Sequence, residues 1–214
     1  MKMKIPLASL AAALIAVTLL PACAPLLIGG AAVGGAMVAS DRRTSGTQVE
    51  DSAIELKAAS RVRDLASLGN VTVTSYNRTV LITGQVPLEA DRTAVEQAVS
   101  RVENVRAVVN ELAVAGNRSL SVRSTDTIIS AKVKATFIDA KDLQSNTLKV
   151  LTERGVVYLM GIVTEREAGR ATDLARSVDG VRKVVRVFEV ISEEALANLL
   201  PKPAATPAPA SALK

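Results

Sequence analysis

The sequence predicts an α+β protein that contains two tandem copies of one small unit. An internal repeat carries this prediction: residues 71–84 match 148–161 at a shift of 77, and residues 102–114 match 178–190 at a shift of 76. Alternating apolar residues indicate strands, whereas apolar residues spaced three and four apart indicate helices. Each unit is predicted as helix, hairpin, helix and strand, so that two helices cover one face of a three-stranded sheet.

The hairpin is the clearest part of each unit. Its turn is predicted at Asn77-Arg78 in the first copy and at Arg154-Gly155 in the second, because these residue types tolerate tight turns. The return strands are expected to end at Gly84 and Gly161. These two glycines should hold equivalent backbone positions, where a side chain would clash or φ is positive.

Four helices are predicted from stripes of apolar residues that would face the core. Each copy has one helix before its hairpin and one after it, and a valine-rich strand follows at 105–114 or 181–191. In chain order, the predicted core positions are Ile54, Ala58, Val62 and Leu65; Val95, Ala98, Val99 and Val102; Ile129, Val133 and Phe137; and Ala171, Leu174, Ala175 and Val178.

The N-terminal segment has the pattern of a bacterial lipoprotein signal. Two lysines precede an apolar run over residues 5–20, and Leu20-Pro21-Ala22-Cys23 follows as a lipobox. We expect Cys23 to become the acylated first residue of the mature chain, since several acyl chains anchor a protein firmly. An ordinary signal peptide cut elsewhere and an uncleaved anchor helix are the alternatives. Ala24, in place of aspartate, favours the outer membrane with the folded part in the periplasm.

Composition then divides the chain into five segments. Residues 24–40 are small and apolar, and they suit either a flexible tether or a membrane helix-packing face at Gly30 and Gly34. A short helix is possible over 193–200, before a Pro/Ala-rich end. The predicted segments are a signal peptide (1–22), a lipidated tether (23–47), a first domain (48–115), a second domain (116–191) and a disordered tail (192–214).

Several residue types are missing, and their absence restricts the chemistry. The chain has no His, no Trp and one Cys, so it offers no imidazole base, no common zinc site and no internal disulfide. Its four aromatic residues are too few for a base-stacking platform, and no loop has a phosphate-cradling pattern. We therefore expect a protein that is not an enzyme, needs no metal or cofactor and does not bind nucleic acid.

The two copies differ in charge and on one helix face. Residues 48–116 hold 7 Lys and Arg against 9 Asp and Glu, whereas residues 117–191 hold 13 against 9. Where the first copy has Ala53, the second has Ile128, which shares a helical stripe with Lys132 and lies close to Lys134. An apolar side chain beside lysines is typical of a surface that binds anionic phospholipid. The alternatives place Ile128 in the core beside Ile129 and treat the charge as ordinary surface charge.

The repeated pattern, with a glycine that closes the second strand and a V-x-x-V motif after the second helix, resembles the BON domain. The resemblance covers residues 48–114 and 126–191, and the lipobox, tether, D-R-R-T-S-G-T-Q-V-E-D (41–51) and T-E-R-G-V-V-Y-L-M-G-I-V-T-E-R-E-A (152–168) are similar to dual-BON outer-membrane lipoproteins. It implies a role in envelope integrity and binding of anionic phospholipid by the second domain, with a large apolar residue at the position of Ile128. The runner-up is a structural module that docks an outer-membrane assembly protein or a cell-wall regulator.

Overall fold

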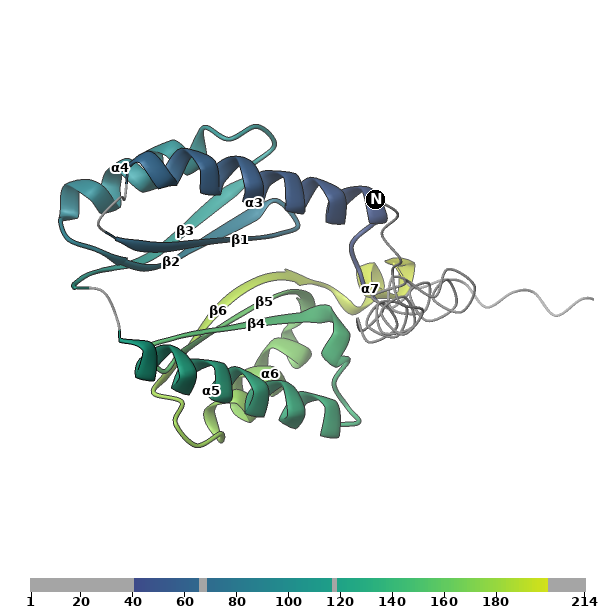
Figure 1. The fold of residues 1–214 in the computed structure, drawn as a ribbon. Coiled ribbons are helices and arrows are strands. Elements are labelled where there is room, and N and C mark those ends of the chain that lie inside the picture. Colours follow the sequence, from purple (N-terminus) through teal and green to yellow (C-terminus); the bar gives the residue numbers. More distant parts are fainter. Residues whose placement is uncertain (1–40, 66–68, 117–118, 200–214) are drawn as a thin grey trace, which may run out of the picture. The chain divides into compact units, whose positions relative to one another are not determined.

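The computed structural model of the protein describes residues 41–65, 69–116 and 119–199, all within one compact unit. Two copies of one arrangement follow each other, and in each copy two helices lie on one face of a three-stranded sheet (Figure 1). The first copy comprises α3 (Ser45–Leu65), β1 (Asn70–Tyr76), β2 (Thr79–Val86), α4 (Glu89–Ser100) and β3 (Ala107–Val114). The second comprises α5 (Leu120–Asp139), the short 3-10 helix η1 (Ser145–Thr147), β4 (Leu148–Glu153), β5 (Val156–Thr164), α6 (Glu165–Arg176) and β6 (Lys183–Ile191). A last helix, α7, spans Glu193–Leu199. The predicted fold class is confirmed.

The two sheets share one topology and one register. The central strand, β2 or β5, pairs antiparallel with its hairpin partner and parallel with the last strand of the unit. Gly84 lies opposite Val71 and Leu112, and Gly161 lies opposite Leu148 and Phe188. These pairs are related by the same shifts of 77 and 76 residues that define the sequence repeat.

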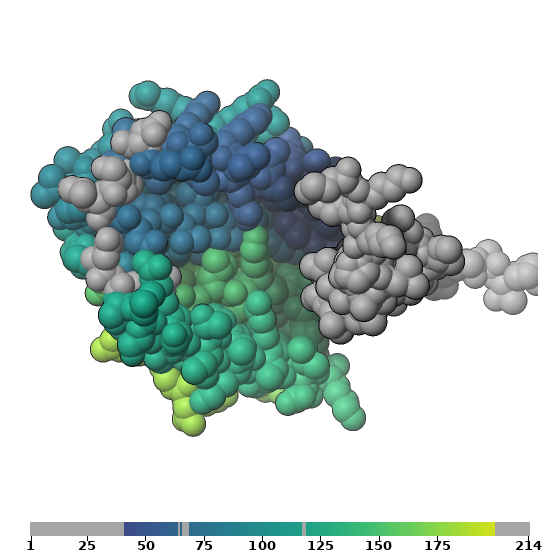
Figure 2. Space-filling model, in the orientation of Figure 1, coloured from purple at the N-terminus to yellow at the C-terminus, as the bar shows by residue number. Residues whose placement is uncertain are grey.

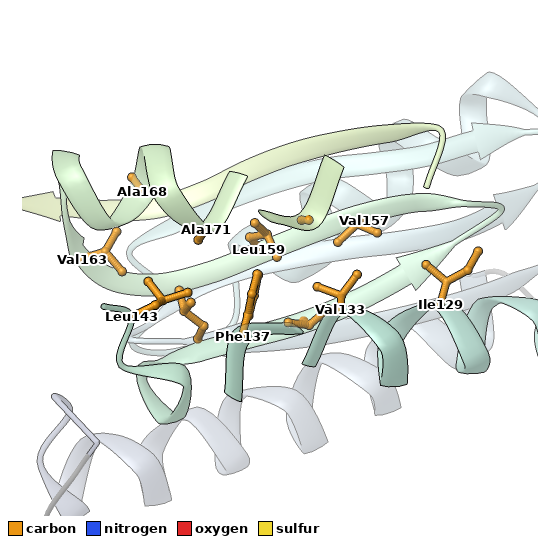
Figure 3. Close-up of a cluster of buried hydrophobic side chains, with 12 residues drawn as sticks. Ile129, Val133, Phe137, Leu143, Val157, Leu159, Val163, Ala168 and Ala171 are labelled. Atoms are coloured by element: carbon orange, nitrogen blue, oxygen red, sulfur yellow. The ribbon is translucent and has the colours of Figure 1, made fainter. Parts of the chain in front are cut away.

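Each sheet builds its core against its own two helices. In the second copy, Ile129, Val133 and Phe137 point from α5 toward Leu159 of β5, with Ala171 of α6 beside them (Figure 3). The first copy is built in the same way from residues of α3, β2 and α4. Helical periodicity therefore located most of the core correctly, with two exceptions. Ala98 is only half-buried and is not part of the apolar cluster of the first copy. Leu65 is 42% exposed, because it is the last residue of α3 and lies beyond the contact with the sheet.

The two glycines are equivalent, but they do not end the return strands as predicted. Strand β2 continues to Val86 and β5 to Thr164, because backbone pairing needs no side chain. Gly84 has φ +122°, and a Cβ there would lie 1.8 Å from the carbonyl oxygen of Asn70. At Gly161 a Cβ would lie 2.7 Å from the carbonyl oxygen of Thr147. Both positions therefore exclude a side chain, and Gly84 also has the positive φ.

The predicted tether extends too far toward the first domain, since α3 begins at Ser45 and the residues before it are held in place. The Arg42 guanidinium donates to both carboxylate oxygens of Glu167 at 2.7 Å, and the pair is almost fully buried. Arg43 donates to Asp51 at 2.8 Å and stacks on the Tyr76 ring. The partner of Arg42 lies 125 residues away in the sequence, so local periodicity could not show that this segment is held in place. The predicted tether was therefore too long.

At the other end, α7 lies inside the segment predicted as a disordered tail, where the sequence also allowed a short helix. The signal peptide, Cys23, the Gly/Ala segment 24–40 and residues 200–214 lie outside the described residues.

A third apolar cluster joins residues of both sheets. It contains Tyr76 and Leu81 of the first copy with Tyr158, Met160 and Ile162 of the second. The Tyr76 hydroxyl donates to the carbonyl oxygen of Thr147 at 3.0 Å, so the buried phenol keeps a hydrogen bond. Burial is the main cause that raises the pKa of Tyr76, to about 12. The sheet face opposite the helices is thus also apolar, and the sheets are buried on both faces.

Candidate functional site

Helix α5 carries all three residues predicted to bind lipid, and its fold fixes which way they point. Ser119 caps its N-terminus by accepting a hydrogen bond from the Val122 amide at 3.4 Å. Asp126, Ile129, Val133 and Phe137 recur every three or four residues and are buried against the sheet. This stripe orients the opposite face of the helix toward solvent.

The C-terminal half of α5 carries a stripe of apolar residues on its solvent face. Ile128 is 56% exposed, whereas its neighbour Ile129 is 3% exposed, so the core alternative for Ile128 is wrong. Ala131, Ala135 and Ile138 continue the exposed stripe at spacings of three, four and three, and Ile138 is 70% exposed. We call Ile128, Ala131, Ala135 and Ile138 the apolar stripe. The space-filling view shows the outer surface of α5 facing the viewer, in green (Figure 2).

Two lysines flank the apolar stripe on opposite sides. At about 100° per residue, Lys132 lies some 40° to one side of Ile128, and Lys134 lies about 120° to the other. Both are exposed, and neither forms an ion pair with any residue that the structure describes. The helix therefore combines exposed apolar surface with two lysines that have no ion-pair partner among the described residues.

The corresponding helix of the first copy is a useful internal comparison. Helix α3 also exposes apolar residues, since Val49 is 71% and Leu56 is 73% exposed. Its charges differ, however. Lys57, which aligns with Lys132, is paired with Glu103 at 2.9 Å, and the position of Lys134 is Ala59. The two helices thus differ at the positions of Lys132, Lys134 and Ile128, while α3 carries its own exposed basic residues, Arg61 and Arg63, further along the helix.

An aspartate in the first helix of each copy holds the hairpin turn, a role that the sequence did not reveal. Asp51 accepts hydrogen bonds from the Asn77 and Arg78 amides, both at 2.8 Å, and Asp126 accepts from Arg154 and Gly155 at 2.9 and 2.8 Å. Burial opposes ionisation of Asp51, but its hydrogen bonds outweigh burial and lower its pKa. The turns need this support because Asn77, Arg78 and Arg154 all have positive φ.

No group of carboxylates, histidines or cysteines within the described ranges could hold a metal ion. Among these same residues, no helix is both long and apolar enough to cross a membrane.

Both structural copies match one known protein family. The family model described as "BON domain" matches twice, at residues 50–116 and 125–192. The chain belongs to the BON-domain family. The two matches coincide with the two structural copies, so each copy is one BON domain, and the resemblance seen in the sequence is confirmed.

The similarity to individual proteins covers more of the chain than one BON domain. The chain is 38% identical over 190 residues to "Outer membrane lipoprotein DolP" of Haemophilus influenzae, an alignment that covers 87% of this chain and 97% of the relative. It is 29% identical to the "21 kDa hemolysin" of Actinobacillus pleuropneumoniae (71% and 79% covered). It is 30% identical to "Osmotically-inducible protein Y" of Escherichia coli (70% and 77% covered). The similarity to the DolP lipoprotein therefore extends over nearly the whole length of that relative and includes both BON domains of this chain.

Proposed function

We propose that this protein is an outer-membrane lipoprotein that faces the periplasm, binds anionic phospholipid through its second BON domain and supports envelope integrity. The observation that carries the proposal is the apolar stripe of α5 with unpaired lysines on both flanks. Similarity to an outer membrane lipoprotein over nearly its whole length supports the location. Binding is assigned to Ile128, Lys132 and Lys134, with anchoring at Cys23.

The mechanism follows from where the groups lie on the helix. An exposed isoleucine that enters the headgroup region removes apolar surface from water, at about 25 cal/mol per Å². Lysines on the flanks are then level with lipid phosphates, and each basic residue near an anionic surface contributes about 1 kcal/mol. The lipid anchor would add a second attachment, which raises the effective concentration of α5 at the membrane.

The lysines give a test of this proposal with vesicles. We expect Lys132→Glu and Lys134→Glu each to weaken flotation of residues 41–214 with phosphatidylglycerol vesicles, by roughly tenfold, because charge reversal replaces attraction by repulsion. Added salt should reduce binding of the unchanged protein in the same way, since the charges are exposed. Lys57→Glu in α3 is the matched control and should have little effect. Equal binding to zwitterionic and anionic vesicles would rule out the electrostatic part of the proposal.

A second prediction concerns the anchor. Cys23→Ser should release the protein into the soluble periplasmic fraction and abolish labelling by a fatty-acid analogue, because the thioether can no longer form. Fractionation and metabolic labelling of the same cells provide the measurement. Persistence of both membrane association and label in Cys23→Ser would show that Cys23 is not the acylated residue.

The alternative function, docking of an envelope-assembly protein or a cell-wall regulator, has one observation of its own. Val49 and Leu56 are exposed on α3, which lacks the free lysines of α5. A protein surface could cover these side chains, whereas phospholipid would gain little attraction there. If vesicle binding fails in the tests above, Val49 and Leu56 are the residues to change first in a search for partners.

A further inference from the structure

A cavity of about 470 Å³ opens beside the N-terminal half of α5, on the flank of the helix that carries Lys132. Its walls come from three places: α5, the turn between β4 and β5, and the loop before β6. They include two arginines, Arg154 and Arg182, and the hydroxyl-bearing residues Ser121 and Thr125. The apolar residues Val122 and Ile129 also line it. A cavity with guanidinium groups and an apolar floor is suited to an organic anion.

Neither arginine forms an ion pair with an acidic residue in the part of the chain that the structure describes. The Arg154 guanidinium donates to the carbonyl oxygen of Gly116 at 2.6 Å, and its Nε is buried with no hydrogen-bond partner. The Arg182 side chain forms no hydrogen bond or ion pair with any described residue, and it is exposed where it lines the cavity. The carboxylate of Asp126 also lines the cavity, but both its oxygens accept backbone amides of the turn. The exposed Arg182 guanidinium therefore offers this cavity a positive charge that an anionic ligand would pair with.

At the corresponding turn and loop of the first copy, the arginines are paired with carboxylates, and the residue aligned with Arg154 is Asn77. There, Arg106 aligns with Arg182 and is paired with Glu189, and Arg78 in the turn is paired with Glu50. The position of Glu50 is Thr125 in the second copy, so a carboxylate has been replaced by a hydroxyl.

Two glycines make room in the second copy. The Arg182 stem crosses Gly155, where a Cβ would lie 2.8 Å from its Cδ, and Gly155 aligns with Arg78. Gly180 approaches Ile129, whose Cδ1 would lie 3.1 Å from a Cβ. The second copy has therefore lost the acidic residue and the bulky turn residue that occupy the first.

We propose that this cavity binds a phosphoryl group through Arg154 and Arg182. Guanidinium groups match phosphate oxygens in geometry, and two of them with a hydroxyl can engage several oxygens of one phosphoryl group. A phospholipid headgroup and a soluble phosphate ester share this chemistry. A lipid as the source of the phosphoryl group rests on the proposed function, because the cavity and the apolar stripe share helix α5. The phosphoryl site itself does not depend on that function.

The test uses the full chain carrying Cys23→Ser, titrated with sn-glycerol 3-phosphate and followed by NMR at the Gly155 and Gly180 amides. Both signals should shift, and Arg182→Gln should weaken the affinity by about tenfold or more. Lys183→Gln, one residue along and outside the cavity, is the charge-matched control and should stay within about twofold. Thr125→Glu should abolish binding, since it restores the carboxylate found in the first copy.

Shifts that are absent, or that are equally weakened by Lys183→Gln, would overturn the proposal. Succinate binding as tightly as sn-glycerol 3-phosphate would also overturn it, because the site would then select for charge alone.

Phosphatidylglycerol vesicles distinguish the two sources. If Arg182→Gln weakens vesicle binding as well, the phosphoryl group belongs to lipid. If it weakens only binding of the soluble ester, the site takes a soluble phosphate. Ile128→Glu should leave the affinity for sn-glycerol 3-phosphate unchanged. Vesicle binding that survives Ile128→Glu would therefore reject the lipid proposal while leaving the phosphoryl site in place.

Discussion

Ile128→Glu should weaken binding to anionic vesicles by roughly 30- to 100-fold and leave the melting temperature nearly unchanged. The binding loss combines about 2 kcal/mol of lost apolar burial with repulsion of the new charge by lipid phosphates. Stability should change by less than about 0.5 kcal/mol, because Ile128 is 56% exposed and packs little against the domain. Vesicle co-sedimentation and thermal unfolding of the same sample measure both quantities.

Two controls make this result specific. Ala53→Glu changes the aligned position on α3 and should leave vesicle binding as it is. Ile129→Glu changes the neighbouring core residue, which is 3% exposed, and should unfold the second domain. A melting temperature that falls as far in Ile128→Glu as in Ile129→Glu would contradict the orientation of the helix described above.

Gly84→Ala should lower the free energy of unfolding by about 3 kcal/mol or more, which is the largest stability effect that we expect from adding one methyl group. Its Cβ would lie 1.8 Å from the Asn70 carbonyl oxygen, and φ is +122°, so both a clash and backbone strain arise. Strand β1 would have to move away from β2, with loss of pairing near Val71. Chemical denaturation measures the change.

Another glycine supplies the control for this prediction. Gly169 lies within α6, and a Cβ there has nothing within 4 Å. Gly169→Ala should therefore be neutral or stabilise the protein by up to about 1 kcal/mol, because alanine is the better helix former. If Gly84→Ala unfolds at the same denaturant concentration as the unchanged protein, the close approach of β1 to Gly84 is wrong.

The local parts of this fold could be predicted from the sequence, and the long-range polar contacts could not. The stripe of Ile129, Val133 and Phe137 fixes which face of α5 is buried, and it therefore also fixes that Ile128 is outside. Equivalence of Gly84 and Gly161 followed from the repeat, because the two copies keep the same strand register. The strands ran past these glycines because hydrogen-bond ladders depend on the backbone and not on the side chain.

The positions of Arg42 and Arg182 in the fold are examples of what the sequence alone could not predict. Arg42 reaches Glu167, 125 residues away, and no local pattern indicates such a partner. Arg182 is one of several basic residues in the second copy, and only the fold places it beside Arg154 and Gly155. The sequence does contain one signal for this cavity, which is the replacement of the acidic Glu50 of the first copy by Thr125 in the second. A position-by-position comparison of the charged residues of the two copies would have found it.

The most direct test of lipid binding by α5 uses the absence of tryptophan from the chain. Ile128→Trp introduces a single fluorophore on the apolar stripe, and Ala53→Trp places one at the aligned position of α3. With phosphatidylglycerol vesicles that contain brominated acyl chains, the emission of Ile128→Trp should shift to shorter wavelength and be quenched, because the indole enters the interface. Ala53→Trp should remain unshifted and unquenched. Equal quenching at both positions, or none at Ile128→Trp under conditions where the protein binds the vesicles, would contradict binding through this helix.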